Sequence, residues 1–328
     1  MRFEPLYQYR LWGGRRLADV LSVTLPGEDP VGEAWILSDR DEHSSVVADG
    51  PLKGATLGQL VSECPVRLFG NGHAEFNRFP LLLKFLDARA TLSVQVHPSD
   101  RQTDYLPAGE SGKTEAWVVL AVGRDCRIYA GLTPGTTPEL LRESLANDSV
   151  TDHLAFFDPS PGDAVFIPAG TVHSLRDVII FEVQENSNVT FRLYDWNHLD
   201  PKTHRRRPLQ VEPAMACIDF LKGAIAPIVP IVEQCKTSLR ERLFDCEHFK
   251  LWRLCGKSPF TVGLAGALRV LVCIAGHGHV KHSGADYPFR AGDVLLLAAE
   301  VGACLCYPCG EVELLEISPP AGSPPPIN

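Results

Sequence analysis

The stretch PGDAVFIPAGTVH, residues 161–173, joins a Gly-Asp turn, a short apolar strand and a Pro-Gly turn that leads to a histidine. A second copy, AGDVLLLAAEVGA at 291–303, keeps the Gly-Asp turn and the strand but has Ala303 where the first copy has His173. Self-similarity of this kind indicates a repeated structural unit. We therefore expect two related β-rich units, of which only the first carries polar side chains suited to chemistry.

Most of the remaining chain shows the same type of pattern. Short apolar runs of alternating character, such as EAWVVLAV and VTFRLYDW, are separated by Gly, Pro, Asp and Asn, which is typical of antiparallel sandwiches and barrels. Helices are expected to be few and short, with candidates at 56–69, 136–147 and 212–223. The predicted fold is mainly β, with a catalytic domain at 1–229 and a second, degenerate domain at 230–328 that ends in an extended or disordered tail, SPPAGSPPPIN.

Composition excludes several classes of protein. The 328 residues are 45% hydrophobic, enough to bury a core in each of two domains. The N-terminus has no signal-peptide core, and no run approaches the roughly 18 apolar residues of a membrane span, so we expect a cytoplasmic protein without membrane contact. The net charge of 31 − 40 = −9 argues against nucleic acid as a partner, and we expect the basic run Arg205–Arg207 to be a solvated loop.

The cysteines and the C-terminal histidines suggest other metal sites. Eight of the ten cysteines lie between Cys217 and Cys309, and without a secretory signal we expect reduced thiols. The tight group CLCYPC, 304–309, lacks a second pair at finger-like spacing, which favours a buried strand over a thiolate metal site. A second metal site at His277, His279 and His282 is disfavoured, because the second copy lacks the equivalent of His173.

Polar side chains interrupt apolar strands at Gln95, His97, Glu115 and His173. Gln95 and His97 lie two positions apart in LSVQVHPSD (92–100), so an extended chain points both to one face. Imidazole and carboxylate are ligands of zinc and other divalent first-row metals. Each residue alone could be a hydrogen-bonded core residue, and Glu115 could simply pair with Lys113. Together they would be costly to bury without a metal or other partners, so we expect a metal site.

The motifs around these residues resemble those of one enzyme family, the type I mannose-6-phosphate isomerases, zinc-dependent members of the cupin superfamily, in their short bacterial form. The motifs are YRLWGGRRL (9–17), GEAWILSD (32–39), FPLLLKFLDA (79–88), QVHPSD (95–100), GKTEAW (112–117), PGDAVFIPAGTVHSL (161–175) and RLYDW (192–196). The resemblance covers roughly residues 1–215. It implies two jelly-roll domains of cupin type and a sugar-phosphate substrate, and it leaves a monomer and a dimer both open.

The resemblance also implies roles for individual residues. It implies that one zinc ion per chain is bound by Gln95, His97, Glu115 and His173. The catalytic residues that it implies are Arg192, Glu182 and Lys113. The substrate-binding residues are Trp12, Glu33, Ser93 and His198.

The implied chemistry moves a proton between C1 and C2 of an aldose and a ketose phosphate through an enediolate. A divalent metal can polarise the substrate oxygens, and the permanently charged Arg192 can stabilise the developing negative charge. The base that removes the proton needs a pKa that can be shifted towards neutrality. We expect Glu182 to be that base, with Lys113 as the rival.

Two other functions use similar ligands. An iron-dependent oxygenase of the cupin type would bind its metal through His and Glu, but Gln95, Lys113 and Arg192 suit an anionic sugar better than dioxygen. A non-catalytic sugar-phosphate-binding cupin would be marked by loss of a ligand or of Arg192, and none of them is lost.

One position departs from the family pattern. Two residues after RLYDW the family usually has Arg or Lys, whereas this chain has His198. A histidine of ordinary pKa is mostly neutral near pH 7, so phosphate binding would be weaker or more pH-dependent unless His204 or the run Arg205–Arg207 compensates. A preferred substrate other than mannose 6-phosphate stays open.

Overall fold

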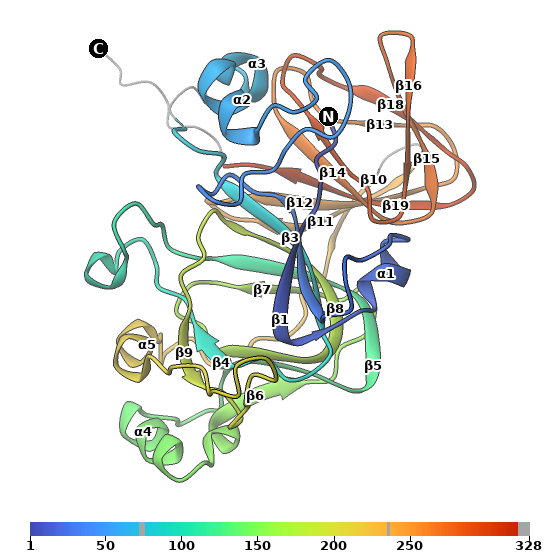
Figure 1. Cartoon of the computed structure of the whole chain (residues 1–328). Coiled ribbons are helices and arrows are strands. Elements are labelled where there is room, and N and C mark those ends of the chain that lie inside the picture. The colour runs from blue at the N-terminus through green and yellow to red at the C-terminus, as the bar shows by residue number, and fades with distance from the viewer. Residues whose placement is uncertain (72–75, 235–236, 321–328) are drawn as a thin grey trace.

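A computed structural model describes residues 1–71, 76–234 and 237–320 (Figure 1). Within these ranges the protein is mainly β, as predicted, and every strand pairing is antiparallel. One nine-stranded sheet uses only strands that precede residue 195, and a six-stranded and a four-stranded sheet use only strands that follow residue 230. The change of sheet agrees in position with the predicted domain boundary, although the domain limits themselves stay a prediction.

The N-terminal sheet is organised around one long strand, β8. Its strands are β1 (Leu6–Gly14), β2 (Val31–Leu37), β3 (Leu81–Ala88), β4 (Val94–Val96), β5 (Glu115–Leu132), β6 (Leu154–Phe157), β7 (Ala164–Ile167), β8 (His173–Glu185) and β9 (Phe191–Tyr194). Ile180 of β8 is flanked by Leu86 of β3 on one side and Val119 of β5 on the other. The start of β8 pairs with β4, where His173 lies opposite Gln95. This pairing brings the predicted ligand strands together.

The C-terminal half contains two further sheets. The six-stranded sheet contains β10 (Ile231–Gln234), β11 (Leu239–Asp245), β12 (Lys250–Gly256), β19 (Val312–Ser318), β14 (Arg269–Ala275) and β17 (Val294–Leu297). The four-stranded sheet contains β13 (Phe260–Val262), β18 (Cys304–Pro308), β15 (His277–His282) and β16 (Ala285–Arg290). Side chains from both sheets form one apolar cluster that includes Cys304 and Cys306. Cys304 and Cys306 are therefore buried on one face of a strand, as predicted, whereas Leu305 and Cys309 of the same stretch are exposed. The nine described cysteines are free thiols.

The two Gly-Asp turns of the sequence repeat have matching geometry. Gly162 and Gly292 have φ angles of 93° and 91°, which L-residues rarely adopt. The carboxylate of Asp163 accepts a hydrogen bond from Ser160 N, and that of Asp293 accepts one from Arg290 N. The internal repeat is thus a repeat of structure, and β7 and β17 are equivalent strands.

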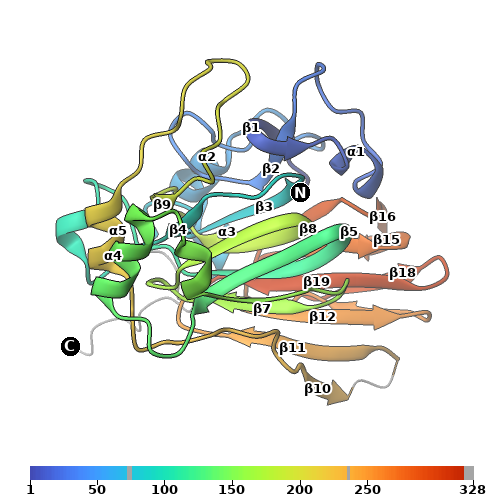
Figure 2. The ribbon, with the colours of Figure 1, turned by 90° about the horizontal axis from the view of Figure 1, so that it is seen from below.

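Apolar side chains join the two halves of the chain. One cluster contains residues of both halves, among them Phe181, Phe249 and Leu315. Phe166 of β7 stacks on Phe244 at the end of β11, with ring centroids 5.8 Å apart, and also contacts Phe249 at 6.4 Å. Figure 2 shows β11 and β12 lying beneath β5 and β7. The halves share core packing rather than a solvated hinge.

The helices are short and lie outside the sheets. They are α1 (Leu17–Val20), α2 (Leu57–Glu63), α3 (Pro65–Phe69), α4 (Pro138–Ala146) and α5 (Val211–Cys217), with one-turn 3-10 segments at Thr103–Tyr105 and Val150–His153. The three helical regions are confirmed, but α5 is shorter than predicted and ends at Cys217. Within the described part of the chain no helix is long and apolar enough to cross a membrane. Most of the predicted disordered tail, residues 321–328, lies outside the described residues.

Candidate active site

A cavity of about 360 Å³ opens within the N-terminal sheet. Its walls come from β1, β2, β3, β4, β5, β8 and β9, and from the loops around β9. All but three of the predicted site residues line it; the exceptions are Ser93, His97 and His198. The fold therefore collects side chains from sequence positions 12 to 192 around one space.

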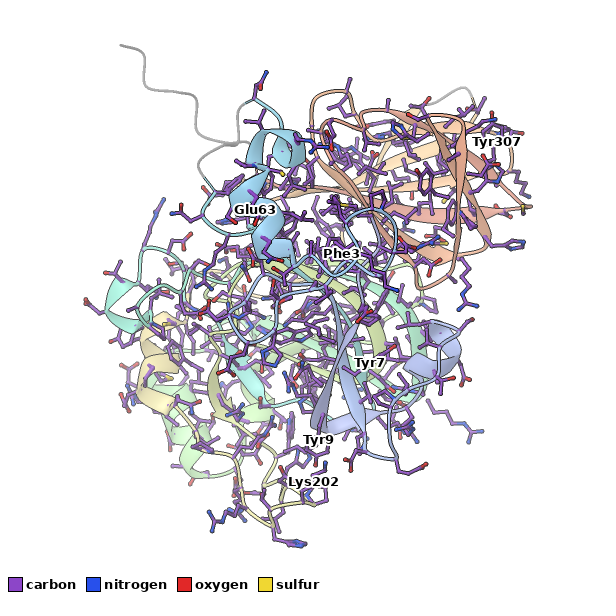
Figure 3. All side chains as sticks on the ribbon, turned by 45° about the horizontal axis from the view of Figure 1, so that its top comes forward. Phe3, Tyr7, Tyr9, Glu63, Lys202 and Tyr307 are labelled. Atoms are coloured by element: carbon purple, nitrogen blue, oxygen red, sulfur yellow. The ribbon has the colours of Figure 1, made fainter. Side chains whose placement is uncertain are left out.

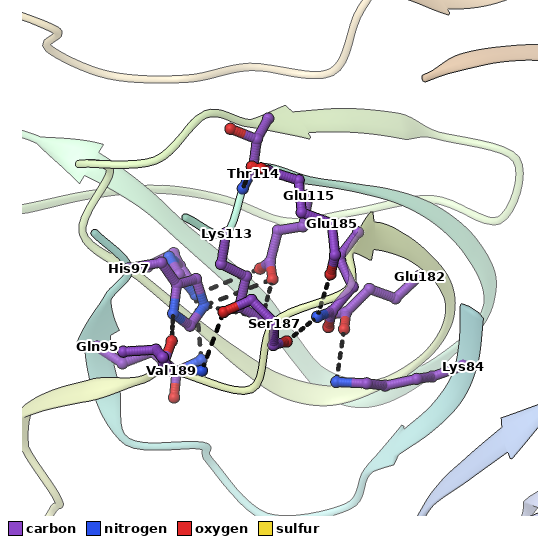
Figure 4. Close-up of polar contacts among 12 residues, drawn as sticks. Lys84, Gln95, His97, Lys113, Thr114, Glu115, Glu182, Glu185, Ser187 and Val189 are labelled. Atoms are coloured by element: carbon purple, nitrogen blue, oxygen red, sulfur yellow. Dashed lines mark hydrogen bonds and ion pairs between the residues drawn. The ribbon is translucent and has the colours of Figure 1, made fainter. Parts of the chain in front are cut away.

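Two histidines and one glutamate form a buried cluster at the end of this cavity (Figure 4). The Nε2 atoms of His97 and His173 each lie 3.4 Å from a carboxylate oxygen of Glu115. One donor atom from each residue lies within 4.8 Å of the other two, and all three side chains are about 1% exposed. This is a spacing at which a single ion can contact all three.

Backbone carbonyls set the tautomers of both histidines. His97 Nδ1 donates to Val189 O and His173 Nδ1 donates to Thr171 O, each at 2.9 Å. With the proton on Nδ1, the lone pair of Nε2 points into the cluster, which is the arrangement of a metal-ligating histidine. Burial, with Lys113 nearby, lowers the pKa of His97 to about 3, and burial also lowers the pKa of His173. Both rings are neutral at pH 7, and the set is suited to a divalent cation.

Lys113 lies among the ligand atoms. Its ammonium forms an ion pair with Glu115 and a 3.0 Å hydrogen bond to His97 Nε2. Burial acts to lower the pKa of Lys113, but Glu115 and Glu182 outweigh it and raise the pKa. Burial likewise acts to raise the pKa of Glu115, and Lys113 together with His97 holds it well below its usual value. The pair is therefore charged on both sides.

The strand β4 has the alternation that its sequence predicts. Val94 and Val96 are fully buried in an apolar cluster on one face. On the other face Gln95 Nε2 donates to His173 Nε2 at 3.1 Å, so the Gln95 side chain contacts the cluster. Ser93 is buried and its hydroxyl donates to Gln95 Oε1 at 3.2 Å. Ser93 thus supports Gln95, and its role in substrate binding stays a prediction.

Glu182 has cationic and aromatic partners on the cavity wall. Lys84 Nζ lies 3.2 Å from Glu182 Oε1 (Figure 4). Trp117 Nε1 donates to Glu182 Oε2 at 3.1 Å. Burial and the negative charge of Glu115 raise the pKa of Glu182. Lys84 was not predicted as a site residue. Its signal was available, because a lysine in the apolar strand FPLLLKFLDA needs a buried partner.

The pKa of Glu33 is shifted in the opposite direction. Burial acts to raise the pKa of Glu33, but Arg10 and Lys84 outweigh it and hold the pKa at about 2. Arg10 makes two hydrogen bonds to this carboxylate, at 2.9 and 3.1 Å, and Trp35 Nε1 donates a third. Glu33 therefore stays ionised, while Trp12 forms an apolar part of the wall.

Two arginines lie at the mouth of the cavity. Arg192 of β9 donates from Nη1 to Pro208 O, and its Nε is buried without a hydrogen-bond partner among the described residues. Burial, followed by the charge of Arg207, lowers the pKa of Arg192. Arg207 lines the cavity and is held by a two-point ion pair with Asp195. The prediction that the run Arg205–Arg207 is a solvated loop was wrong for Arg207, because the Asp195 pair turns it inward.

His198 does not reach the cavity. Trp196 and Asn197 have φ angles of 53° and 56°, so the chain turns sharply after β9 and leaves the strand direction. The His198 ring is half-buried, and burial lowers its pKa. It supplies no positive charge at pH 7, and its predicted role at the substrate stays a prediction.

The other suggested metal sites are not formed. In the described residues, His277, His279 and His282 do not gather their ring nitrogens, and His279 instead stacks on Tyr307 at 5.0 Å. A second group of potential ligands does exist, formed by Asp100, Glu185 and His248. It lies outside the predicted site.

Jelly-roll sheets that place two imidazoles and a carboxylate around one point define a cupin protein with a candidate metal centre. Residues 1–114 match the family model "Phosphomannose isomerase type I, catalytic domain". The chain is 33% identical to mannose-6-phosphate isomerase ManA of Bacillus subtilis over 92% of this chain and 93% of that one, and 32% identical to the mannose-6-phosphate isomerase of Streptococcus mutans over 90% and 92%. The crystal structure of the mannose 6-phosphate isomerase from Bacillus subtilis matches with a TM-score of 0.88 and 27% identity, covering 96% and 98% of the two chains. The chain belongs to the type I mannose-6-phosphate isomerase family.

The protein is accordingly an enzyme of the isomerase class. The resemblance predicted from its motifs is confirmed. The two alternatives, an iron-dependent oxygenase and a non-catalytic binding protein, have no support from these relatives.

The cluster geometry leads to a test of metal binding. After removal of metal with a chelator and addition of one equivalent of zinc, we expect the protein to retain one zinc ion per chain, measured by elemental analysis after gel filtration. His173→Ala should weaken zinc binding at least about tenfold, because one of the donors is lost. His279→Ala is the matched control and should retain zinc; equal retention by both variants would contradict the assignment.

Proposed function

We propose that the enzyme interconverts mannose 6-phosphate and fructose 6-phosphate, with one zinc ion held by His97, Glu115, His173 and Gln95. The observation that carries the proposal is the buried His-Glu-His cluster at the end of a cavity that also contains a carboxylate of raised pKa, Glu182. When bound, the ion would act as a Lewis acid on the substrate oxygens. We propose zinc because two imidazoles and a carboxylate are its usual catalytic ligands.

The environment of Glu182 supports its proposed role as the base. A carboxylate that removes a proton from carbon needs a pKa nearer neutrality than that of a solvated glutamate, and burial beside Glu115 provides this. Lys84 and Trp117 hold the carboxylate in one orientation. Lys113 is the weaker candidate, because its raised pKa and its pairing with Glu115 keep it protonated.

The arginines at the mouth support binding of a phosphorylated sugar. Arg207 uses Nε and Nη2 for Asp195, so Nη1 is the group that an anion would meet. Arg192 lines the same cavity and makes no ion pair with a carboxylate of the described residues. We propose that Arg207 provides the positive charge that His198 does not, and that Arg192 stabilises negative charge on the substrate.

The segment that carries Arg207 is attached to the rest of the site. Lys202 Nζ lies 4.0 Å from the centre of the Tyr9 ring, and the Tyr9 hydroxyl donates to Asp200 (Figure 3). These contacts hold the segment 197–207 against β1. We also propose the division into domains at 1–229 and 230–328. We propose a cytoplasmic location for the enzyme, and both a monomer and a dimer stay open.

The proposed activity is tested directly. Purified protein loaded with zinc should convert mannose 6-phosphate to fructose 6-phosphate, measured by coupling fructose 6-phosphate to a dehydrogenase assay. A chelator should stop the reaction and zinc should restore it. Absence of turnover with every hexose 6-phosphate tried would refute the isomerase proposal for this chain.

Replacing Glu182 by Gln should reduce kcat by at least about a hundredfold, because the amide cannot accept the proton. The zinc content should stay at one per chain, since Glu182 is not a proposed ligand. Turnover near that of the parent enzyme would rule out Glu182 and leave Lys113 as the base.

Replacing Arg207 by Ala should raise KM for mannose 6-phosphate by about tenfold, the effect of losing a charge-assisted hydrogen bond. Arg206→Ala is a matched control, because Arg206 is an exposed neighbour. It should change KM by less than about twofold, as expected for a solvated charge. Similar KM values for both variants would remove Arg207 from the phosphate site.

A further inference from the structure

Three consecutive backbone N–H groups just before β5 are held by groups that lie outside this segment. The bonds run from the nitrogens of Gly112, Lys113 and Thr114 to Asp100 Oδ1 (2.7 Å), Pro98 O (3.0 Å) and Glu185 Oε2 (2.6 Å). The segment 112–114 carries the side chain of Lys113 and leads directly into Glu115. Its backbone position therefore decides where two active-site groups lie.

The contact with the 98–100 turn is unusually close. A Cβ atom at Gly112 would lie 2.6 Å from the backbone nitrogen of Asp100, so a side chain does not fit there. The turn follows His97 directly in sequence. The segment 112–114 is thus fastened to the chain that carries one of the proposed ligands.

The third bond connects this segment to the C-terminal half of the protein. Glu185 accepts from Thr114 N with Oε2, and its Oε1 lies 3.2 Å from His248 Nδ1. His248 lies in the hairpin between β11 and β12. The next residue, Phe249, is fully buried and contacts Phe166 of β7, which holds the hairpin in place.

The group Asp100, Glu185 and His248 is better described as a hydrogen-bonded clamp than as a metal site. Its donor atoms lie within 4.8 Å of one another, but Asp100 and Glu185 already accept backbone N–H groups and His248 is already paired with Glu185. Glu185 is largely buried, and a buried carboxylate needs such partners. The bonds that would have to break for a metal to enter are those that hold the active-site segment.

We propose that His248 is a positioning residue for the isomerase site: it orients Glu185, which holds the Thr114 N–H and so sets Lys113 and Glu115 relative to His97. The C-terminal half, which carries His248, thereby acts on the reaction without touching the substrate. The kinetic part of this inference rests on the proposed function, whereas its metal-binding part does not.

The test compares His248→Ala with His248→Asn, whose amide nitrogen can take the place of Nδ1. We expect His248→Ala to lower kcat about tenfold and to speed the loss of zinc to a chelator about tenfold, the usual size of effects from groups that orient metal ligands. KM for mannose 6-phosphate should change less than about twofold, since the proposed phosphate site at Arg207 does not involve His248. His248→Asn should restore most of both losses, which a general loss of stability would not explain.

Two further variants make the test specific. Glu247 Oε1 lies 3.4 Å from His248 Nε2, but the Glu247 side chain is exposed, so Glu247→Ala should change kcat and the rate of zinc loss by less than about twofold. In a Glu185→Gln background, His248→Ala should have little further effect, because the relay through Glu185 is already broken. Thermal unfolding of each variant confirms that it is folded.

Several outcomes would overturn the inference. The first is an unchanged kcat and an unchanged rate of zinc loss in His248→Ala. The second is no recovery of either quantity in His248→Asn. The third is the same effect of His248→Ala in the parent enzyme and in the Glu185→Gln background. A second zinc ion per chain that disappears in His248→Ala would replace the clamp by a metal site. If the parent enzyme shows no turnover, the isomerase proposal fails, and the rate of zinc loss still decides the role of His248.

Discussion

Burial of three carboxylates in one cavity requires a cation beside each, and the N-terminal sheet is arranged to supply them. An unpaired charge in such a place would cost more than the fold can offset. Glu33, Glu115 and Glu182 are paired in turn with Arg10, Lys113 and Lys84. Nearby cations lower the pKa of Glu33 and of Glu115, whereas burial and the negative charge of Glu115 raise the pKa of Glu182. The three carboxylates of one cavity therefore differ in the direction of their pKa shifts.

The long strand β8 fixes the positions of several side chains of the site. It is 13 residues long and pairs with β3, β4 and β5. It therefore contacts β4 and β5, the two other strands that bring residues to the His97–Glu115–His173 cluster. It carries His173 at its start, Glu182 towards its end and Glu185 as its last residue. Because hydrogen bonds to neighbouring strands set its register, these three side chains keep fixed separations. The three carboxylates and His173 are therefore carried by strands, whereas His97, Lys113 and Arg207 lie outside them.

The sequence was sufficient where side-chain direction follows from local alternation. The pairing of Gln95 and His97 on one face of β4, opposite two core valines, follows from the two-residue period of a strand. Lys84 was within reach of the same reasoning, since a lysine inside an apolar strand demands a partner. Arg207 and His248 were not, because their proposed roles depend on tertiary contacts, with Asp195 and with Glu185 of the other half of the molecule. Neither alternation nor spacing carries that information.

The two Gly-Asp turns show which residues of the repeated unit are needed for its fold and which are not. Both copies keep the aspartate that ties the turn, while only the first keeps a histidine at the position of His173 and the second has Ala303. The residues that specify the strand are thus separable from those that specify the chemistry. The second copy keeps the turn and the apolar strand, and its buried side chains Val294 and Leu296 join the cluster that packs the two halves together. The same unit of chain thus supplies a ligand-bearing wall in one half and a supporting surface in the other.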